Sequence, residues 1–229
     1  MLRLEAACKA YTRQGKTVEA LRPTSLDIGA GEYVAVVGPS GSGKSTFLTV
    51  VGGMMAPTTG KVWLEGRSLY DLTVSQRAAV RGTRIGFVFQ TFNLVPYLTA
   101  LENVQVPLYL AGIAPKEQRR RATAALERVG LADRLGHKPS ELSVGQQQRV
   151  ALARTLVNDP ALILADEPSG NLDPDTRELV LGLFEEFHGE GRTLVVVTHD
   201  PAVAARSRRT LRLVAGRVDE EPPGERNVA

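Results

Sequence analysis

The stretch Gly38-Pro-Ser-Gly-Ser-Gly-Lys-Ser45 constrains the fold of this chain more than any other. It matches the pattern G-x-x-x-x-G-K-[ST], and it lies between a predicted strand, Tyr33–Val37, and a run of helical character, Thr46–Val51. In this setting the glycines let the backbone curl, so that successive N–H groups can surround a phosphate. Lys44 is then expected to bind phosphate oxygens, and Ser45 is expected to ligate Mg²⁺. A plain Gly/Ser-rich turn is the alternative, and the flanking elements disfavour it.

Four short runs rich in valine, isoleucine and leucine, each bounded by turn residues, are predicted to be buried parallel strands. They are Tyr33–Val37, Ile85–Phe89, Ala161–Ala165 and Thr193–Thr198. In open α/β sheets, ligands bind just beyond the carboxyl ends of the strands. We therefore expect an α/β fold in which the residues after these four runs face one site.

Polar side chains follow the last three of these runs: Gln90, then Asp166 and Glu167, then His199. Gln90, Glu167 and His199 form, with Lys44, the predicted catalytic set. Asp166 is expected to hold Mg²⁺ and Glu167 to direct the attacking water. Gln90 is neutral and can touch Mg²⁺ or the water, while His199 is a candidate sensor of the γ-phosphate. Each residue alone is also typical of an ordinary turn after a strand, so the prediction depends on their sharing one sheet with the glycine-rich loop.

Composition limits the class of protein. The 229 residues, 43% of them hydrophobic, suffice for one compact domain with a full core. The formal charge of +3 comes from scattered basic residues, so no nucleic-acid partner is expected. No apolar run reaches the roughly 18–20 residues that span a bilayer, and no signal peptide is recognisable, so a cytoplasmic location is expected. The single cysteine, Cys8, excludes an internal disulfide and is predicted to be a core residue.

Three smaller predictions concern the surface. Arg119–Arg121 open an amphipathic pattern and are predicted to lie on a solvated helix face. Residues from Asp219 onward are polar and proline-bearing, which predicts a loose tail. His137 and His188 lack a strand-end setting and are predicted to be surface residues.

The stretch ELSVGQQQRVALAR, residues 141–154, predicts a helix that begins near Ser143. Gln146 falls three residues after Ser143, as in a capping box. Gly145 in the first turn costs roughly 0.5–1 kcal/mol relative to alanine, and the capping box does not need it. Close approach of a phosphate to the helix start would explain the glycine. The glycine-rich loop and Lys44 are expected to bind the chain's own nucleotide. We therefore expect the phosphate near Gly145 to belong to the nucleotide of a second copy, which pairs with this one head to tail about a twofold axis.

Together these motifs resemble the ATP-binding cassette (ABC) superfamily of ATPases. The likeness extends along nearly the whole chain, through Tyr11, GPSGSGKST, Gln90, LSVGQQQRVALAR, LILADEP, SGNLD and Thr198-His199-Asp200. The segments FVFQTFNLVPYLTALENVQVPL and DEPSGNLD are most similar to the lone ATPase subunits that partner lipoprotein-releasing, macrolide- or peptide-exporting and cell-division permeases.

The resemblance implies a single domain, residues 1–229, with an α/β P-loop NTPase core of RecA-like type. A small antiparallel β subdomain is expected around residues 2–30 and 60–70. An inserted α-helical subdomain is expected at about 91–158, between core segments at about 1–90 and 159–218. The loose tail would be 219–229.

The resemblance also assigns roles to residues. Tyr11 would stack on the adenine of ATP, although an ordinary hairpin aromatic is the alternative. The rest of the ATP-binding set would be Gly38, Pro39, Ser40, Gly41, Ser42, Gly43, Lys44, Ser45 and Thr46. Mg²⁺ would be held by Ser45, Gln90 and Asp166. A second copy would contact the nucleotide through Ser143, Gly145, Gln146 and Asp173.

The implied function is ATP hydrolysis that drives a separate membrane permease, with the chain held by its permease at the cytoplasmic face of the inner (plasma) membrane. The segment Phe92–Tyr97 is hypothesised to receive a cytoplasmic helix of the permease, and packing inside the helical lobe is the alternative. A DNA-maintenance ATPase would interrupt the cassette with a coiled coil or zinc modules, and the sequence has neither heptads nor spare cysteines. A small-molecule kinase would share GPSGSGKS but would need neither the LSVGQ segment nor SGNLD.

One residue departs from the family pattern. Val144 stands where the family usually has glycine, as in L-S-G-G-Q. Valine adds bulk near the expected γ-phosphate of the second copy, so Val144→Gly is predicted to raise the rate of ATP turnover, measured as steady-state phosphate release beside wild type. Equal or lower turnover would show that the valine points aside and is accommodated.

Overall fold

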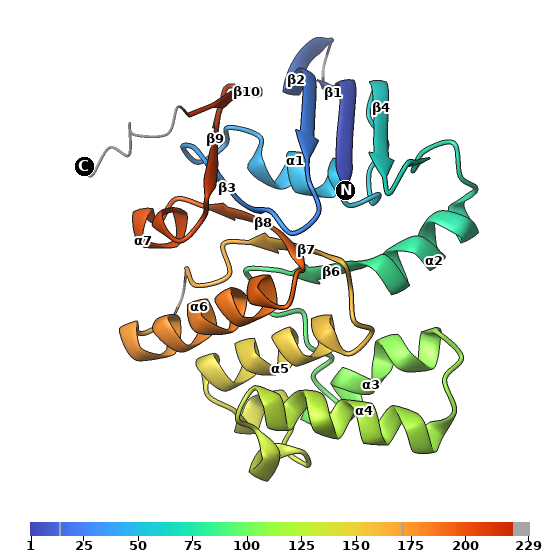
Figure 1. Cartoon of the computed structure of the whole chain (residues 1–229), viewed down its shortest axis with the longest axis vertical. Helices are drawn as coiled ribbons and strands as arrows, with labels where there is room; N and C mark the ends of the chain where they lie inside the picture. The colour runs from blue at the N-terminus through green and yellow to red at the C-terminus, as the bar shows by residue number, and fades with distance from the viewer. Residues whose placement is uncertain (14, 171, 222–229) are drawn as a thin grey trace.

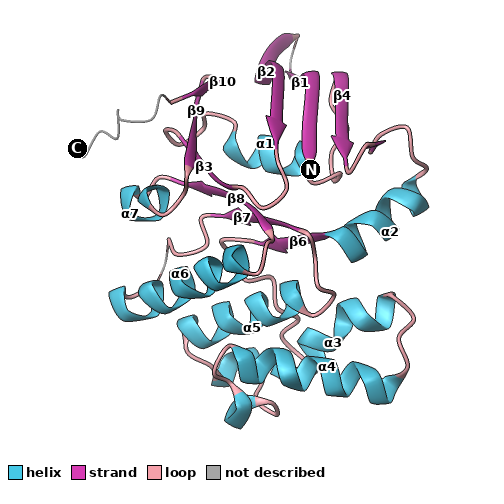
Figure 2. Cartoon of the chain, viewed as in Figure 1, coloured by secondary structure: helices cyan, strands magenta, loops and turns pink. Residues whose placement is uncertain are grey.

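The computed structural model describes residues 1–13, 15–170 and 172–221, which form two β-sheets and a set of helices (Figures 1 and 2). In chain order the elements are β1 (Leu2–Arg13), β2 (Lys16–Ile28), β3 (Tyr33–Val37), α1 (Lys44–Val51), β4 (Thr59–Leu64), β5 (Arg67–Ser68), α2 (Val74–Arg84), β6 (Ile85–Val88), α3 (Ala100–Leu110), α4 (Pro115–Arg128), η1 (Ala132–Arg134), η2 (Pro139–Glu141), α5 (Val144–Leu156), β7 (Leu162–Asp166), α6 (Pro174–Gly189), β8 (Thr193–Thr198), α7 (Pro201–Ala205), β9 (Arg209–Val214) and β10 (Arg217–Glu220).

The larger sheet has the strand order β10-β9-β3-β8-β7-β6. All of its neighbouring strands pair in parallel except β10, which is antiparallel to β9. Both faces are buried, because successive side chains of a strand point to opposite faces: in β8, Leu194 and Val196 join one core cluster while Val195 and Val197 join the other. The four predicted strands are confirmed, with small shifts at their ends. Phe89 lies outside β6, and Asp166 is the last residue of β7.

The smaller sheet is antiparallel, with the order β2-β1-β4-β5, and it confirms the predicted β subdomain. Helix α1 lies between the two sheets (Figure 1). Its buried side chains, Phe47 and Val51 among them, join Leu4 and Val62 of the smaller sheet in one apolar cluster. Burial of this cluster fixes the start of α1, and hence the glycine-rich loop before it, against both sheets.

Helices α3, α4 and α5 gather on the opposite side of the larger sheet (Figure 1). Their shared core includes Val104, Leu108, Leu126 and Val150, and it continues onto α6 and the sheet. On α4 the apolar side chains of Ala122 and Leu126 are buried, and Arg119–Arg121 are exposed as expected. Glu117 lies 2.7 Å from Arg120 and 2.6 Å from Arg121, so this basic group is partly neutralised on its own helix.

Two surface predictions were wrong. Asp219 and Glu220 belong to β10, where Asp219 pairs with Arg212 in the ladder and Glu220 forms a 2.7 Å ion pair with Arg209. Edge pairing and the ion pair thus order a polar sequence that lacks apolar alternation; residues 222–229 lie outside the described part. His137 and His188 are both half-buried rather than free on the surface. The Nε2 of His188 lies 3.0 Å from the Gly31 carbonyl oxygen.

Two other predictions concern the burial of the single cysteine and the length of the apolar helices. Cys8 is buried, as predicted. Within the described residues, every helix falls short of the length and apolar character that a bilayer crossing requires.

Candidate nucleotide site

The loop between β3 and α1 takes its shape from a glycine and a lysine. Gly43 has a φ of 109°, and a Cβ there would lie 2.0 Å from the Ala20 carbonyl oxygen, so only glycine fits. The ammonium of Lys44 is buried and donates hydrogen bonds to the carbonyls of Gly38 (2.8 Å) and Pro39 (3.0 Å). A positive charge is thus held over a curled backbone, which is the arrangement that binds phosphates.

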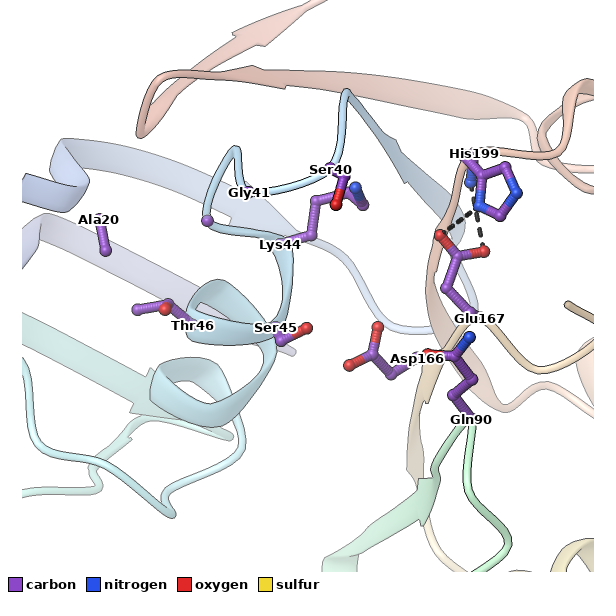
Figure 3. A pocket seen from close by; sticks show the side chains of 11 residues that line it. Ala20, Ser40, Gly41, Lys44, Ser45, Thr46, Gln90, Asp166, Glu167 and His199 are labelled. Atoms are coloured by element: carbon purple, nitrogen blue, oxygen red, sulfur yellow. Dashed lines mark hydrogen bonds and ion pairs between the residues drawn. The ribbon is translucent and has the colours of Figure 1, made fainter.

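A pocket of about 630 Å³ opens over this loop and joins the ends of four adjacent strands (Figure 3). Ten of the predicted site residues line it: Ser40, Gly41, Gly43, Lys44, Ser45, Thr46, Gln90, Asp166, Glu167 and His199. The parallel pairing of β3, β8, β7 and β6 therefore brings together side chains separated by up to 159 positions in the sequence, from Ser40 to His199. Ala20 of β2 also lines the pocket, and no sequence pattern marked it.

Four residues of the predicted ATP set do not line the pocket: Gly38, Pro39 and Ser42 of the loop, and Tyr11. The carbonyls of Gly38 and Pro39 hold Lys44, and Ser42 is buried. Tyr11 lies on β1, 40% exposed, and its hydroxyl donates to Met55 Sδ at 2.8 Å. Stacking of Tyr11 on adenine stays a prediction.

Asp166 is the carboxylate best placed to hold a cation. Burial raises its pKa above the ordinary aspartate value, and the neighbouring Glu167 adds to the rise, while Ser45 and Lys44 oppose it. In Figure 3 the carboxyl of Asp166 faces the Ser45 hydroxyl across the pocket. One carboxylate with a hydroxyl and the Gln90 amide fits Mg²⁺, which is usually held by one or two carboxylates, water and substrate phosphates. The described residues contain no cluster of three or more His, Cys, Asp or Glu that could hold a metal ion by themselves.

Glu167 and His199 form a hydrogen-bonded pair at the ends of β7 and β8 (Figure 3). His199 Nδ1 lies 2.7 Å from Glu167 Oε1, and the His199 backbone N–H donates to Oε2 at 3.3 Å. The Glu167 backbone has a φ of 45°, in the left-handed region that costs a non-glycine residue roughly 1–2 kcal/mol. Strain of this kind is commonly stored at functional sites. Glu167 combines this backbone conformation with a carboxylate that is hydrogen-bonded to His199 at the edge of the pocket.

The predicted contacts to a second copy lie at the starts of α5 and α6, outside this pocket. Ser143 caps α5, and the capping box with Gln146 is present. Asp173 caps α6, where its carboxylate accepts a hydrogen bond from the Thr176 backbone N–H at 3.0 Å, a bond that lowers the pKa of Asp173.

Gly145 has a neighbour within its own chain. It is buried, and a Cβ there would lie 2.4 Å from Thr176 Cγ2 and 2.9 Å from Thr176 Oγ1. The close packing of α5 against α6 therefore explains this glycine without an outside ligand. Contact of Ser143, Gly145, Gln146 and Asp173 with a second copy's nucleotide stays a prediction.

Helix α5 also holds the segment that follows Gln90. Arg154 donates to the carbonyls of Phe92 (2.7 Å) and Asn93 (2.6 Å), and burial lowers the pKa of its guanidinium. Arg154 thereby ties this segment to the helix that begins at Ser143.

Replacement of Gly145 by alanine tests the internal explanation. Gly145→Ala is expected to lower the free energy of unfolding by about 1–3 kcal/mol, because the new methyl group overlaps Thr176. Thr176→Ala introduced into the same chain should recover most of this loss, and Thr176→Ala alone serves as the control. Urea denaturation measures all three. If Gly145→Ala is as stable as wild type, the contact with Thr176 does not require a glycine at this position, and contact with another molecule becomes the better explanation.

The raised pKa of Asp166 predicts a stability cost at neutral pH. A carboxyl whose pKa is higher in the folded state stabilises the fold below its unfolded pKa, and this contribution is lost as the pH rises through the folded pKa. At pH 7 the ionised Asp166 therefore destabilises the nucleotide-free chain, and Asp166→Asn should raise the free energy of unfolding. The gain should shrink as the pH falls below the ordinary aspartate pKa of about 3.9. Urea denaturation of wild type and Asp166→Asn, at pH 7 and at a pH below about 3.9, checks this. Equal stability of the two proteins at pH 7 would contradict the prediction.

Comparison with known proteins agrees with this geometry. The family model for ABC transporters matches residues 21–170. An uncharacterized ABC transporter ATP-binding protein of Thermotoga maritima is 52% identical over 211 residues, covering 92% of this chain and 90% of that protein. A macrolide export ATP-binding/permease protein of Paracoccus denitrificans is 46% identical over 218 residues, covering 95% of this chain but only 33% of that longer protein.

Among solved structures, the ATP-binding cassette MJ0796, a dimer in a post-hydrolysis state bound to ADP and Pi, superposes with a TM-score of 0.91 at 43% identity. The superposition covers 96% of this chain and 98% of that chain, and it confirms the α/β P-loop NTPase fold with its antiparallel β subdomain and helices. The chain therefore belongs to the ABC transporter family, as an ATPase that binds ATP with Mg²⁺.

Proposed function

We propose that two copies of this chain bind ATP between them head to tail, hydrolyse it, and so drive a separate integral membrane permease of exporter or lipoprotein- or peptide-extruding type. The observation that carries the proposal is the convergence of Lys44, Asp166, Glu167 and His199 on one pocket at the ends of adjacent parallel strands. The dimeric state of the MJ0796 cassette and the ATP-binding/permease name of the Paracoccus relative support it.

Within one copy, the loop N–H groups and Lys44 would bind the phosphates of ATP. Glu167 would accept a hydrogen bond from the attacking water and take up its proton, since its side chain is only 12% exposed and its carboxylate is already oriented by His199. Ser45, Gln90 and Asp166 would hold Mg²⁺, which when bound neutralises charge on the phosphates. Tyr11 would stack on the adenine.

The second copy would complete the site through Ser143, Gly145, Gln146 and Asp173. The N–H groups in the first turn of a helix lack intrahelical partners, and in the capping box the Ser143 hydroxyl accepts a hydrogen bond from the N–H of Gln146. The N–H groups of Val144 and Gly145 are therefore suited to a γ-phosphate at the positive end of the helix dipole.

The permease would meet the segment Phe92–Tyr97. A hollow of about 540 Å³ is lined by residues that include Phe92, Leu94, Pro96 and Val144. Val95 is 40% and Tyr97 is 81% exposed, which favours a surface that meets a partner over simple packing inside the helical lobe. Docking here would hold the chain at the cytoplasmic face of the inner (plasma) membrane.

The mass of Glu167→Gln in solution tests the dimer. Loss of the carboxylate should slow hydrolysis by about 100-fold or more while ATP binding remains, so that the nucleotide-bound dimer accumulates. Light scattering on a sizing column should show a doubled mass with ATP and Mg²⁺ and the single mass without them. Glu178→Gln, which changes an exposed carboxylate on α6 that is paired with Arg206, is the control and should hydrolyse like wild type. A Glu167→Gln protein that binds ATP and stays monomeric would contradict the head-to-tail arrangement.

A further inference from the structure

Helix α5 carries a buried amide that the proposed mechanism does not use. Gln148 is 1% exposed, and its Nε2 donates a hydrogen bond to the Pro168 carbonyl at 2.6 Å. Its Oε1 is also buried and has no hydrogen-bond partner among the described residues. An apolar side chain of the same length would avoid this unpaired oxygen, because buried polar atoms without partners destabilise a fold. The bond to Pro168 is therefore the feature that sets Gln148 apart from a simple core residue.

Pro168 directly follows Glu167, whose backbone lies in the left-handed region with a φ of 45°. A non-glycine residue keeps such a conformation only where its surroundings fix it. On one side, the Glu167 N–H donates to the Val197 carbonyl at 2.9 Å. On the other side, the Gly170 N–H donates to the Glu167 carbonyl at 3.2 Å, and Gln148 holds the carbonyl of the buried Pro168.

We propose that Gln148 is a positioning residue for ATP hydrolysis: it fixes the carbonyl of Pro168, the residue after Glu167, and thereby keeps the Glu167 carboxylate directed at the pocket and at His199. The inference rests on the proposed role of Glu167 as the carboxylate that directs the water. Gln148 lies on the same helix as Ser143, the proposed contact to the second copy. A shift of that helix on dimer closure would therefore reach Glu167 through the bond between Gln148 and Pro168.

The first test is Gln148→Met in the full chain, because methionine keeps the length and apolar contacts of glutamine and removes its amide. The expected result is a kcat about 10–100-fold lower, as small displacements of catalytic groups produce, with the KM for ATP and the thermal unfolding temperature unchanged. The matched control is Gln118→Met. Gln118 is also buried and donates to a backbone carbonyl, that of Ile113, at 2.6 Å, but on α4. This control should keep the wild-type kcat.

The second test places Gln148→Met in the Glu167→Gln background. If Gln148 acts through Glu167, adding Gln148→Met should not lower the residual rate of Glu167→Gln any further, because the carboxylate that Gln148 positions is already absent. Substantial hydrolysis by Glu167→Gln itself would overturn the proposed role of Glu167. An inactive Glu167→Gln beside a Gln148→Met protein with wild-type kcat would overturn only the inference about Gln148.

Gln148→Asn covers the case in which the methionine variant fails to fold. Asparagine keeps the amide but withdraws it by one methylene group from the Pro168 carbonyl, so the same loss of kcat at constant KM is expected. Wild-type kcat in a folded Gln148→Asn would overturn the proposal. A fall in unfolding temperature without a fall in kcat would likewise show that the bond serves stability alone.

Discussion

The parallel pairing of β3, β8, β7 and β6 is the constraint on which the rest of this structure depends. Because the strands run in one direction, their carboxyl ends meet at one edge, and the loops that follow them must share that edge. Apolar clusters cover both faces of the sheet, and their burial stabilises the paired strands. The convergence of Lys44, Asp166, Glu167 and His199 on one pocket therefore follows from the sheet.

Helix α5 adds a second constraint, which connects this edge with a distant surface. Its side chains bind the loops that follow two of the strands: Arg154 holds the backbone after Gln90, and Gln148 holds the backbone after Glu167. Its first turn packs against α6 so closely that Gly145 has no room for a Cβ beside Thr176. The helix that is proposed to touch the second copy's nucleotide is thus also hydrogen-bonded to the loops that carry Gln90 and Glu167, which are proposed to act on the chain's own nucleotide.

Much of the site was predictable from the sequence, because buried parallel strands appear as continuous apolar runs and the polar residues after them stand out. The order of the strands was not, since pairing joins segments far apart in the chain. For the same reason the contact between Gly145 and Thr176 was missed, and a glycine with an internal cause was assigned only an external one. The three consecutive glutamines 146–148 look alike in sequence, and only packing distinguishes the buried Gln148. The polar β10 was missed because edge pairing and an ion pair replaced the apolar alternation that marks most strands.

Calorimetric titration of the wild-type chain and of Lys44→Ala with ATP, each with and without Mg²⁺, tests most directly whether the strand-end pocket is the nucleotide site. The account predicts one ATP bound per wild-type chain, with tighter binding when Mg²⁺ is present. Lys44→Ala should bind at least about tenfold more weakly, because it loses a hydrogen bond from a charged donor to the phosphates. Binding of equal strength in Lys44→Ala, or no binding by the wild-type chain, would contradict the account.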